Sequence, residues 1–136
     1  MGFTDKFRGQ HNEILQIAKE MTEQMRGQPD PAALRKLLSN LAGKLSFHLA
    51  MEDQALYPRL LGAEDPKVKT MAQQFMTEMG GLGGAFAAYN GKWQVSDIRA
   101  NPEGFAEETR AVFAALTQRI SRENRELYPL ADAAGS

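Results

Sequence analysis

The chain has 136 residues, of which 24% are charged and 43% hydrophobic, and its formal net charge is -1. This length fits a single domain over residues 1–136, because two halves would each be too small to bury a stable core. The balanced charge gives no reason to expect a nucleic acid or an anionic membrane as a partner. The absence of cysteine excludes disulfides, thiolate catalysis and cysteine-ligated metal sites.

The ends and the uncharged stretches of the chain indicate a cytoplasmic protein. The first residues, Met1 to Lys6, lack the basic-then-apolar plan of a secretion signal. The longest uncharged stretch, Met79 to Gly91, is broken by glycines and is too short to span a bilayer. We therefore expect a cytoplasmic, bacterial protein.

Helix starts carry a repeated signal, a capping side chain followed by proline. It occurs at Asp30-Pro31, Asp65-Pro66 and Asn101-Pro102. The side-chain oxygen satisfies a free N–H of the first turn, and proline at the first helical position loses no hydrogen bond. Thr4 or Asp5 can cap an earlier helix in the same way. These signals predict four helices, at about 5–26, 31–61, 66–92 and 102–131. The connections are short, including the one at 94–100, which favours an all-α, up-down-up-down antiparallel four-helix bundle.

Each predicted helix carries an apolar stripe at steps of three and four residues, the spacing of a face turned toward a core. Five ionisable residues interrupt these stripes: His11, His48, Glu52, Arg119 and Glu123. An unpaired carboxylate in an apolar interior costs several kcal/mol or takes up a proton, so these groups need a partner. The interruptions therefore mark the candidate functional site.

Two histidines and a carboxylate fall where they can meet inside the bundle. His48 and Glu52 are four residues apart and project from one helix face. His11 lies near the middle of the first helix, at the level of His48 in an antiparallel neighbour. Two imidazoles and one carboxylate form a ligand set used for Fe(II) and tolerated by zinc or manganese. We predict one transition-metal ion, iron first and zinc or manganese after it, with Glu123 as a fourth ligand.

The second and fourth helices repeat each other. A shift of 71 positions places His48 on Arg119 and Glu52 on Glu123, and Leu56-Tyr57-Pro58 on Leu127-Tyr128-Pro129. A shift of 68 places His11 on Met79. Such a duplication predicts a pseudo-symmetric bundle with paired functional groups. One member of each histidine pair is replaced, so we expect an asymmetric site.

This pattern resembles the hemerythrin and HHE cation-binding family, whose members are four-helix bundles holding a non-haem di-iron site. His11, the His48-Leu49-Ala50-Met51-Glu52 run and the stretch from Glu123 to Pro129 carry the resemblance, which covers almost the whole chain. It implies O2 binding, iron handling, or sensing of O2, NO or redox state. A small diatomic ligand, O2 or NO, is the partner that follows from it.

The chain also departs from the family pattern. Phe75, Met79 and Gly83 occupy the ligand positions of the third helix, and Arg119 stands where the family has a histidine. Arginine is cationic and only donates hydrogen bonds, so it cannot ligate a metal. We expect a mononuclear site in which Arg119 lies between the two glutamates and replaces the charge of the second ion, with Met79 beside it.

Four further expectations concern alternatives and neighbouring features. The main rival to a metal protein is a metal-free relic whose five polar groups form a salt-bridge network, acting as an interaction or regulatory module for a protein partner or a second copy. An enzyme that activates O2 or water is less expected, since no feature suggests a substrate. The run 80–84 predicts either close helix approach, or a kink, or a cavity beside the metal that admits O2. Tyr57 and Tyr128 precede prolines expected to end helices, which predicts hydroxyls near the surface.

Overall fold

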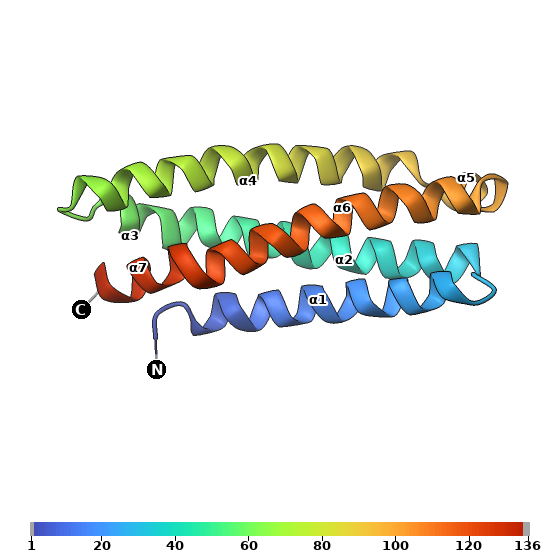
Figure 1. Ribbon diagram of the computed structural model, residues 1–136, viewed down its shortest axis with the longest axis horizontal. Coiled ribbons are helices and arrows are strands. Elements are labelled where there is room, and N and C mark those ends of the chain that lie inside the picture. The colour runs from blue at the N-terminus through green and yellow to red at the C-terminus, as the bar shows by residue number, and fades with distance from the viewer. Residues whose placement is uncertain (1, 135–136) are drawn as a thin grey trace.

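The computed structural model describes residues 2–134. Successive long helices run in opposite directions, and both termini lie at the same end (Figure 1). Four rods are formed by α1 (Asp5–Arg26); by α2 (Pro31–Met51), η1 (Glu52–Leu56) and α3 (Tyr57–Leu61); by α4 (Pro66–Lys92); and by α6 (Pro102–Arg122), η2 (Glu123–Leu127) and α7 (Tyr128–Ala134). The all-helical, up-down-up-down bundle expected from the sequence is confirmed.

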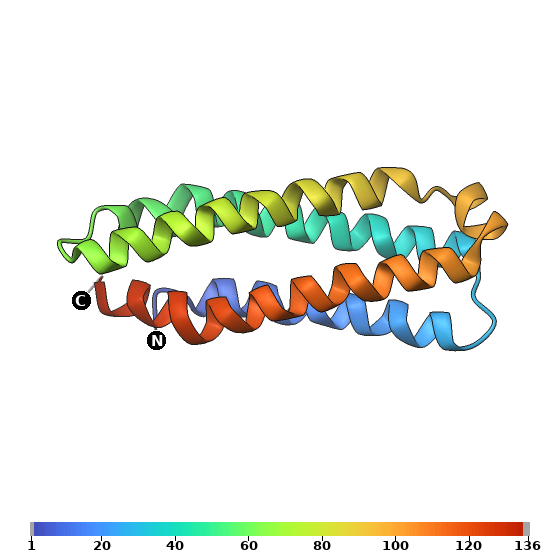
Figure 2. The ribbon, with the colours of Figure 1, turned by 45° about the horizontal axis from the view of Figure 1, so that its top comes forward.

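The rods pack as a ring of four around a shared core. α1 contacts α2 and α6, and α4 contacts the same two helices from the opposite side. Figure 2 shows the two layers that result, α4 with α2 and α6 with α1. Among residues 2–134, no helix is long and apolar enough to cross a membrane.

The predicted helix starts are confirmed by their capping bonds. Asp30 accepts from the N–H of Ala32 at 3.0 Å, and Asp65 accepts from that of Lys67 at 2.9 Å. Asn101 accepts from the N–H of Gly104 at 3.0 Å. The first helix differs, because the Thr4 side chain makes no capping bond there. Its hydroxyl instead donates to Asp132 at 3.0 Å and ties the start of α1 to α7.

The helix bounds agree with those predicted to within a few residues, but the joint at 94–100 and the role of two prolines differ from expectation. The joint expected at 94–100 contains a short helix, α5 (Val95–Ala100), which begins with a capping box between Gln94 and Asp97. Its Ile98 is fully buried, so this segment closes one end of the core. Pro58 and Pro129 do not end their rods either, because helix continues beyond each of them.

The core consists of two apolar clusters with a polar layer between them. The larger cluster includes Ile14, Leu45 and Ile120, and the smaller one includes Phe7 and Leu127. Along the first rod, Phe7 belongs to one cluster and Ile14 to the other, and His11 lies between them. The same alternation occurs on the second and fourth rods, so buried polar residues from three rods meet at one level.

The glycine run at 80–84 lies within α4, which continues through it as a helix. A Cβ added at Gly80, Gly81 or Gly84 would meet nothing within 4 Å, and one at Gly83 would touch only Leu49, at 3.4 Å. The groove beside Gly83, of about 470 Å³, is lined by α2 and α4 without a histidine or a carboxylate. The expected cavity beside the metal is therefore not found at this run, and close approach concerns one glycine only.

Gly80→Ala is expected to raise the free energy of unfolding by about 0.5–1 kcal/mol, because alanine restricts the unfolded chain and meets no obstacle in the folded one. Urea denaturation measures this change. Gly104→Ala is the contrast, since its Cβ would collide with the Asn101 side chain that caps α6 and should lower stability. Equal effects of the two substitutions would contradict this account.

Candidate metal centre

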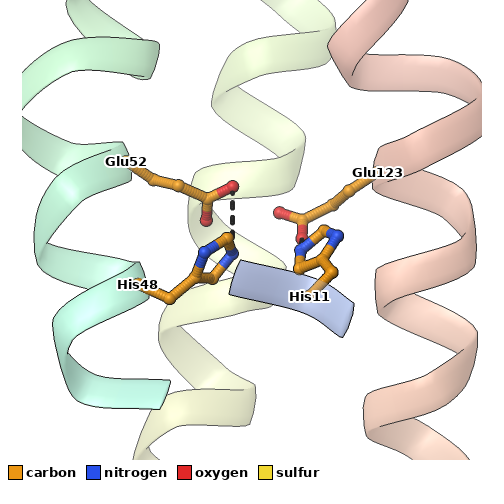
Figure 3. A group of neighbouring side chains, drawn as sticks. All are labelled: His11, His48, Glu52 and Glu123. Carbon is orange, nitrogen blue, oxygen red and sulfur yellow. Dashed lines mark hydrogen bonds and ion pairs between the residues drawn. The ribbon is translucent and has the colours of Figure 1, made fainter. Parts of the chain in front are cut away.

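Three rods bring four ionisable side chains to one point in the polar layer. His11 comes from α1, His48 from α2, Glu52 from the start of η1 and Glu123 from the start of η2. Figure 3 shows their tips turned toward one another, with α4 passing behind them. One ligand atom of each residue lies within 4.8 Å of those of the other three, and none of the four residues is more than 1% exposed.

Each imidazole faces a carboxylate across the centre of this group. The Nε2 atom of His11 lies 3.0 Å from an oxygen of Glu123. The Nε2 atom of His48 lies 3.4 Å from an oxygen of Glu52, four residues further along its own rod. The Nε2 atoms and the carboxylate oxygens thus point at the same small volume.

The outer nitrogen of each imidazole is held by a side-chain amide. His11 donates from Nδ1 to the amide oxygen of Asn124 at 2.9 Å, and His48 donates from Nδ1 to that of Gln10 at 2.7 Å. An amide oxygen only accepts, so the proton sits on Nδ1 and the Nε2 lone pair is directed into the group. Metal-ligating histidines are oriented in this way. The sequence analysis missed Gln10 and Asn124, although they adjoin His11 and Glu123 in the chain.

The helical bundle thus holds a buried set of histidine and glutamate side chains that are oriented as ligands. The sequence comparison shows which family this bundle belongs to. The family model described as Hemerythrin HHE cation binding domain matches residues 2–131. The chain belongs to this family. No curated protein and no solved structure matches the sequence significantly. Within residues 2–134 of this HHE domain, the group of His11, His48, Glu52 and Glu123 could hold a cation.

Tyr128 lies inside the group, and the expectation that its hydroxyl lies near the surface is wrong. The residue is fully buried, and its hydroxyl donates to Glu52 at 2.7 Å. The same oxygen lies 3.0 Å from Nε2 of His11 and 3.5 Å from Nε2 of His48. Tyr57 is also buried, at 2% exposure, and its hydroxyl has no hydrogen-bond partner.

The π turns η1 and η2 explain this inward orientation. In each, the tyrosine N–H bonds to the carbonyl five residues earlier, Tyr57 to Glu52 and Tyr128 to Glu123. Residues five apart on an α-helix differ by about 140° around the axis, whereas a π turn brings them to one side. A proline follows each tyrosine, and proline can neither donate to the carbonyl four residues back nor fit against it. The wider turn removes that conflict and places glutamate and tyrosine on one face.

Arg119 does not lie where the sequence analysis placed it. Its guanidinium pairs with Glu78 on α4, stacks over the Phe75 ring at 4.9 Å and is 12% exposed. It therefore does not lie between Glu52 and Glu123. The long side chain of Arg119 carries its guanidinium toward the edge of the bundle, where keeping the charge near water costs less than burying it.

The internal repeat leaves a second, incomplete half beside the first. Tyr57 corresponds to Tyr128 and Arg119 to His48 under the shift of 71. The hydroxyl of Tyr57 and Nη1 of Arg119 are buried without a hydrogen-bond partner. Burial raises the pKa of Tyr57, and Arg119 opposes this rise. Burial lowers the pKa of Arg119, and Tyr57 opposes this fall. Met79 is buried on α4 and takes the place that His11 has in the first half. The repeat thus supplies two imidazoles in one half and a guanidinium and a thioether at the equivalent positions of the other.

Burial sets the protonation of the group when no ion is bound. Burial, and then the neighbouring Glu52 carboxylate, raises the pKa of Glu123 well above its usual range, although Arg119 opposes this. Burial, and then the nearby His48, lowers the pKa of His11 to about 4. At neutral pH the His11 ring is therefore neutral and available as a ligand, and a bound ion would favour the charged form of Glu123, which burial disfavours.

Glu123→Gln is expected to stabilise the metal-free protein by roughly 1–3 kcal/mol at pH 8, because the amide replaces a carboxyl whose charged form is disfavoured by burial. The folded state holds the Glu123 proton more tightly than the unfolded state, so the stability that Glu123 contributes falls as pH rises above about 4.5; the lowered pKa of His11 acts in the opposite direction in both proteins and cancels in the comparison. The difference between variant and wild type should thus be larger at pH 8 than at pH 5 in urea titrations. Glu13→Gln, at an exposed glutamate, is the control, and a difference independent of pH would contradict the assignment.

Proposed function

We propose that this HHE-domain protein binds one transition-metal ion, iron first and zinc or manganese after it, through His11, His48, Glu52 and Glu123. The observation that carries the proposal is the convergence of two imidazole nitrogens and two carboxylate oxygens within 4.8 Å in a buried layer. Two histidines and a carboxylate suit Fe(II) and leave coordination positions open. The amides that hold both Nδ1 atoms support the same assignment, since they fix the ligand tautomer.

The asymmetry of the layer supports one ion rather than two. On the far side of the carboxylates, Arg119 and Met79 stand where the repeat would supply imidazoles. The guanidinium adds positive charge to that side, and this charge opposes a second cation. Reversible O2 carriage of the di-iron kind draws an electron from each of two irons, which a single ion cannot supply. Sensing or binding of a diatomic ligand such as O2 or NO therefore fits this centre better.

The position of Arg119 favours a bound ion over a metal-free network. In a metal-free relic the five polar groups would neutralise one another, with Arg119 between the glutamates. Arg119 instead pairs with Glu78, and the two glutamates face each other, joined by a hydrogen bond when Glu123 carries a proton. A cation in the layer would take the place of that proton and stabilise both carboxylates.

His48→Ala tests the metal site directly. Wild-type protein is expected to hold about one metal equivalent per chain by elemental analysis, and the variant close to none, because both a ligand and its orienting bond are lost. An ion at 100 times its dissociation constant should raise the free energy of unfolding of the wild type by about 2.7 kcal/mol and therefore raise its melting temperature. The variant should show no such rise.

Phe47→Ala, at the exposed neighbouring residue, is the matched control and should bind metal as the wild type does. Uptake of about two equivalents by the wild type would contradict a single site. A wild-type melting temperature that a chelator leaves unchanged would favour the metal-free interaction module.

The diatomic ligand is tested on anaerobic ferrous protein. Addition of NO is expected to change the optical spectrum and to saturate at about one NO per iron, because the ligand set leaves a position open. Zinc-loaded protein is the control, since zinc has no redox chemistry and should show no such change. A ferrous spectrum that NO does not alter would rule out an open iron site.

A further inference from the structure

We infer that the oxygen of Tyr128 is a direct ligand of the ion, completing a five-donor set with His11, His48, Glu52 and Glu123. The inference rests on the proposed metal site and deepens it, because it specifies which donor chemistry and which metal the site prefers. Three features carry it: the distances around the hydroxyl, the packing that fixes the ring, and the contrast with Tyr57.

The distances around the hydroxyl match the edges of a coordination shell. The Tyr128 oxygen lies 2.7 Å from Glu52 Oε2, 3.0 Å from His11 Nε2 and 3.5 Å from His48 Nε2. Donors bound at about 2.1 Å are separated by roughly 3.0 Å when the bonds meet at right angles and by roughly 3.4 Å at tetrahedral angles. The distances to the two imidazoles fall close to these edges, and the shorter one to Glu52 is that of a hydrogen bond which coordination would replace, so the phenol oxygen would be within reach of an ion held by these three side chains.

Packing holds the tyrosine ring in this position. The ring stacks on His11 with centroids 5.2 Å apart and lies 5.9 Å from Phe7, and the guanidinium of Arg8 is 5.3 Å from its centroid. The residue is fully buried, and its backbone N–H is fixed by the π turn to the Glu123 carbonyl. The hydroxyl cannot leave the group without moving these neighbours, so an incoming ion meets it in place.

The other tyrosine of the repeat shows that this placement is specific. Tyr57 sits on the same kind of π turn, after Glu52, but its hydroxyl has no hydrogen-bond partner. Its side of the layer contains Arg119 in place of an imidazole. Tyr57 therefore has equivalent backbone geometry without the nitrogen ligands and provides a matched control.

A phenol ligand changes which ion the centre stabilises. When the oxygen coordinates, its proton is released to solvent, and Glu52, Glu123 and Tyr128 then supply three anionic oxygens. Their charge balances a ferric ion in a buried layer better than a divalent one. Hard oxygen donors likewise favour the oxidised metal. The centre would thus hold iron most tightly as Fe(III).

The experiment loads the protein with one equivalent of Fe(II) under nitrogen and oxidises it with ferricyanide. A phenolate bound to Fe(III) gives a charge-transfer band in the visible region, which we expect in wild type and in Tyr57→Phe. Tyr128→Phe should lose the band while elemental analysis still finds about one iron per chain. Resonance Raman excitation in the wild-type band should enhance tyrosine ring modes that shift in protein grown on ring-deuterated tyrosine.

The outcomes separate this inference from the proposed function. Wild type that holds one iron without a visible band overturns the tyrosine ligand and leaves the metal site standing, whereas wild type that takes up no iron overturns both. A band that survives in Tyr128→Phe and disappears in Tyr57→Phe assigns the ligand to the other tyrosine and contradicts the inference. Should Tyr128→Phe fail to fold, the isotope shift in wild type together with the intact band in Tyr57→Phe supports Tyr128, because Tyr89 is engaged with Thr109 in the larger cluster.

Discussion

The structure depends on how carboxyl groups are accommodated in an apolar interior. Glu52 and Glu123 are fully buried between two apolar clusters, where an isolated charge is strongly disfavoured. A proton, a hydrogen-bond donor or a cation can each neutralise part of this charge. In the metal-free molecule, Tyr128 donates to Glu52, and burial favours the protonated form of Glu123. That proton lets Glu123 bond to Glu52, and the four side chains at these carboxyls converge as a ligand set would.

The π turns make this layer possible, and they follow from a local conflict in the chain. Proline after each tyrosine cannot continue regular α-helical bonding, so the preceding turn widens by one residue. The consequence is chemical as well as geometric, because the glutamate that opens each turn and the tyrosine that follows it come to share a face. The two turns fall 71 positions apart, at equivalent places in the repeat. Because the second and fourth rods repeat the same π turn, each directs a glutamate and a tyrosine into the same layer.

The sequence predicted the bundle and the convergence of ligands but not the inner contacts. Helix starts could be predicted because Asp30, Asp65 and Asn101 act within their own first turn. The stripe residues could be predicted because α-helical spacing holds along α1 and α4, and along the other two rods as far as Leu56 and Leu127, which are fully buried. The inward position of Tyr128 could not be predicted in this way. α-Helical spacing does not hold through a π turn, and the turn rotates every later residue around the helix axis relative to that spacing. The position of Arg119 could not be predicted either, since it depends on Glu78 and Phe75, which belong to a different rod.

The difference between the two halves of the layer explains why the repeat does not yield two equivalent sites. Each half receives a tyrosine and shares the same two glutamates, so backbone and carboxylates alone do not distinguish them. The imidazoles do: His11 and His48 lie on one side, each held by an amide, whereas the equivalent positions are Met79 and Arg119. A guanidinium that pairs outward with Glu78 leaves the shared carboxylates without a second cation and still places positive charge beside them. Replacing imidazole by arginine therefore removes nitrogen ligands from one half of the layer and leaves both glutamates beside the two histidines of the other.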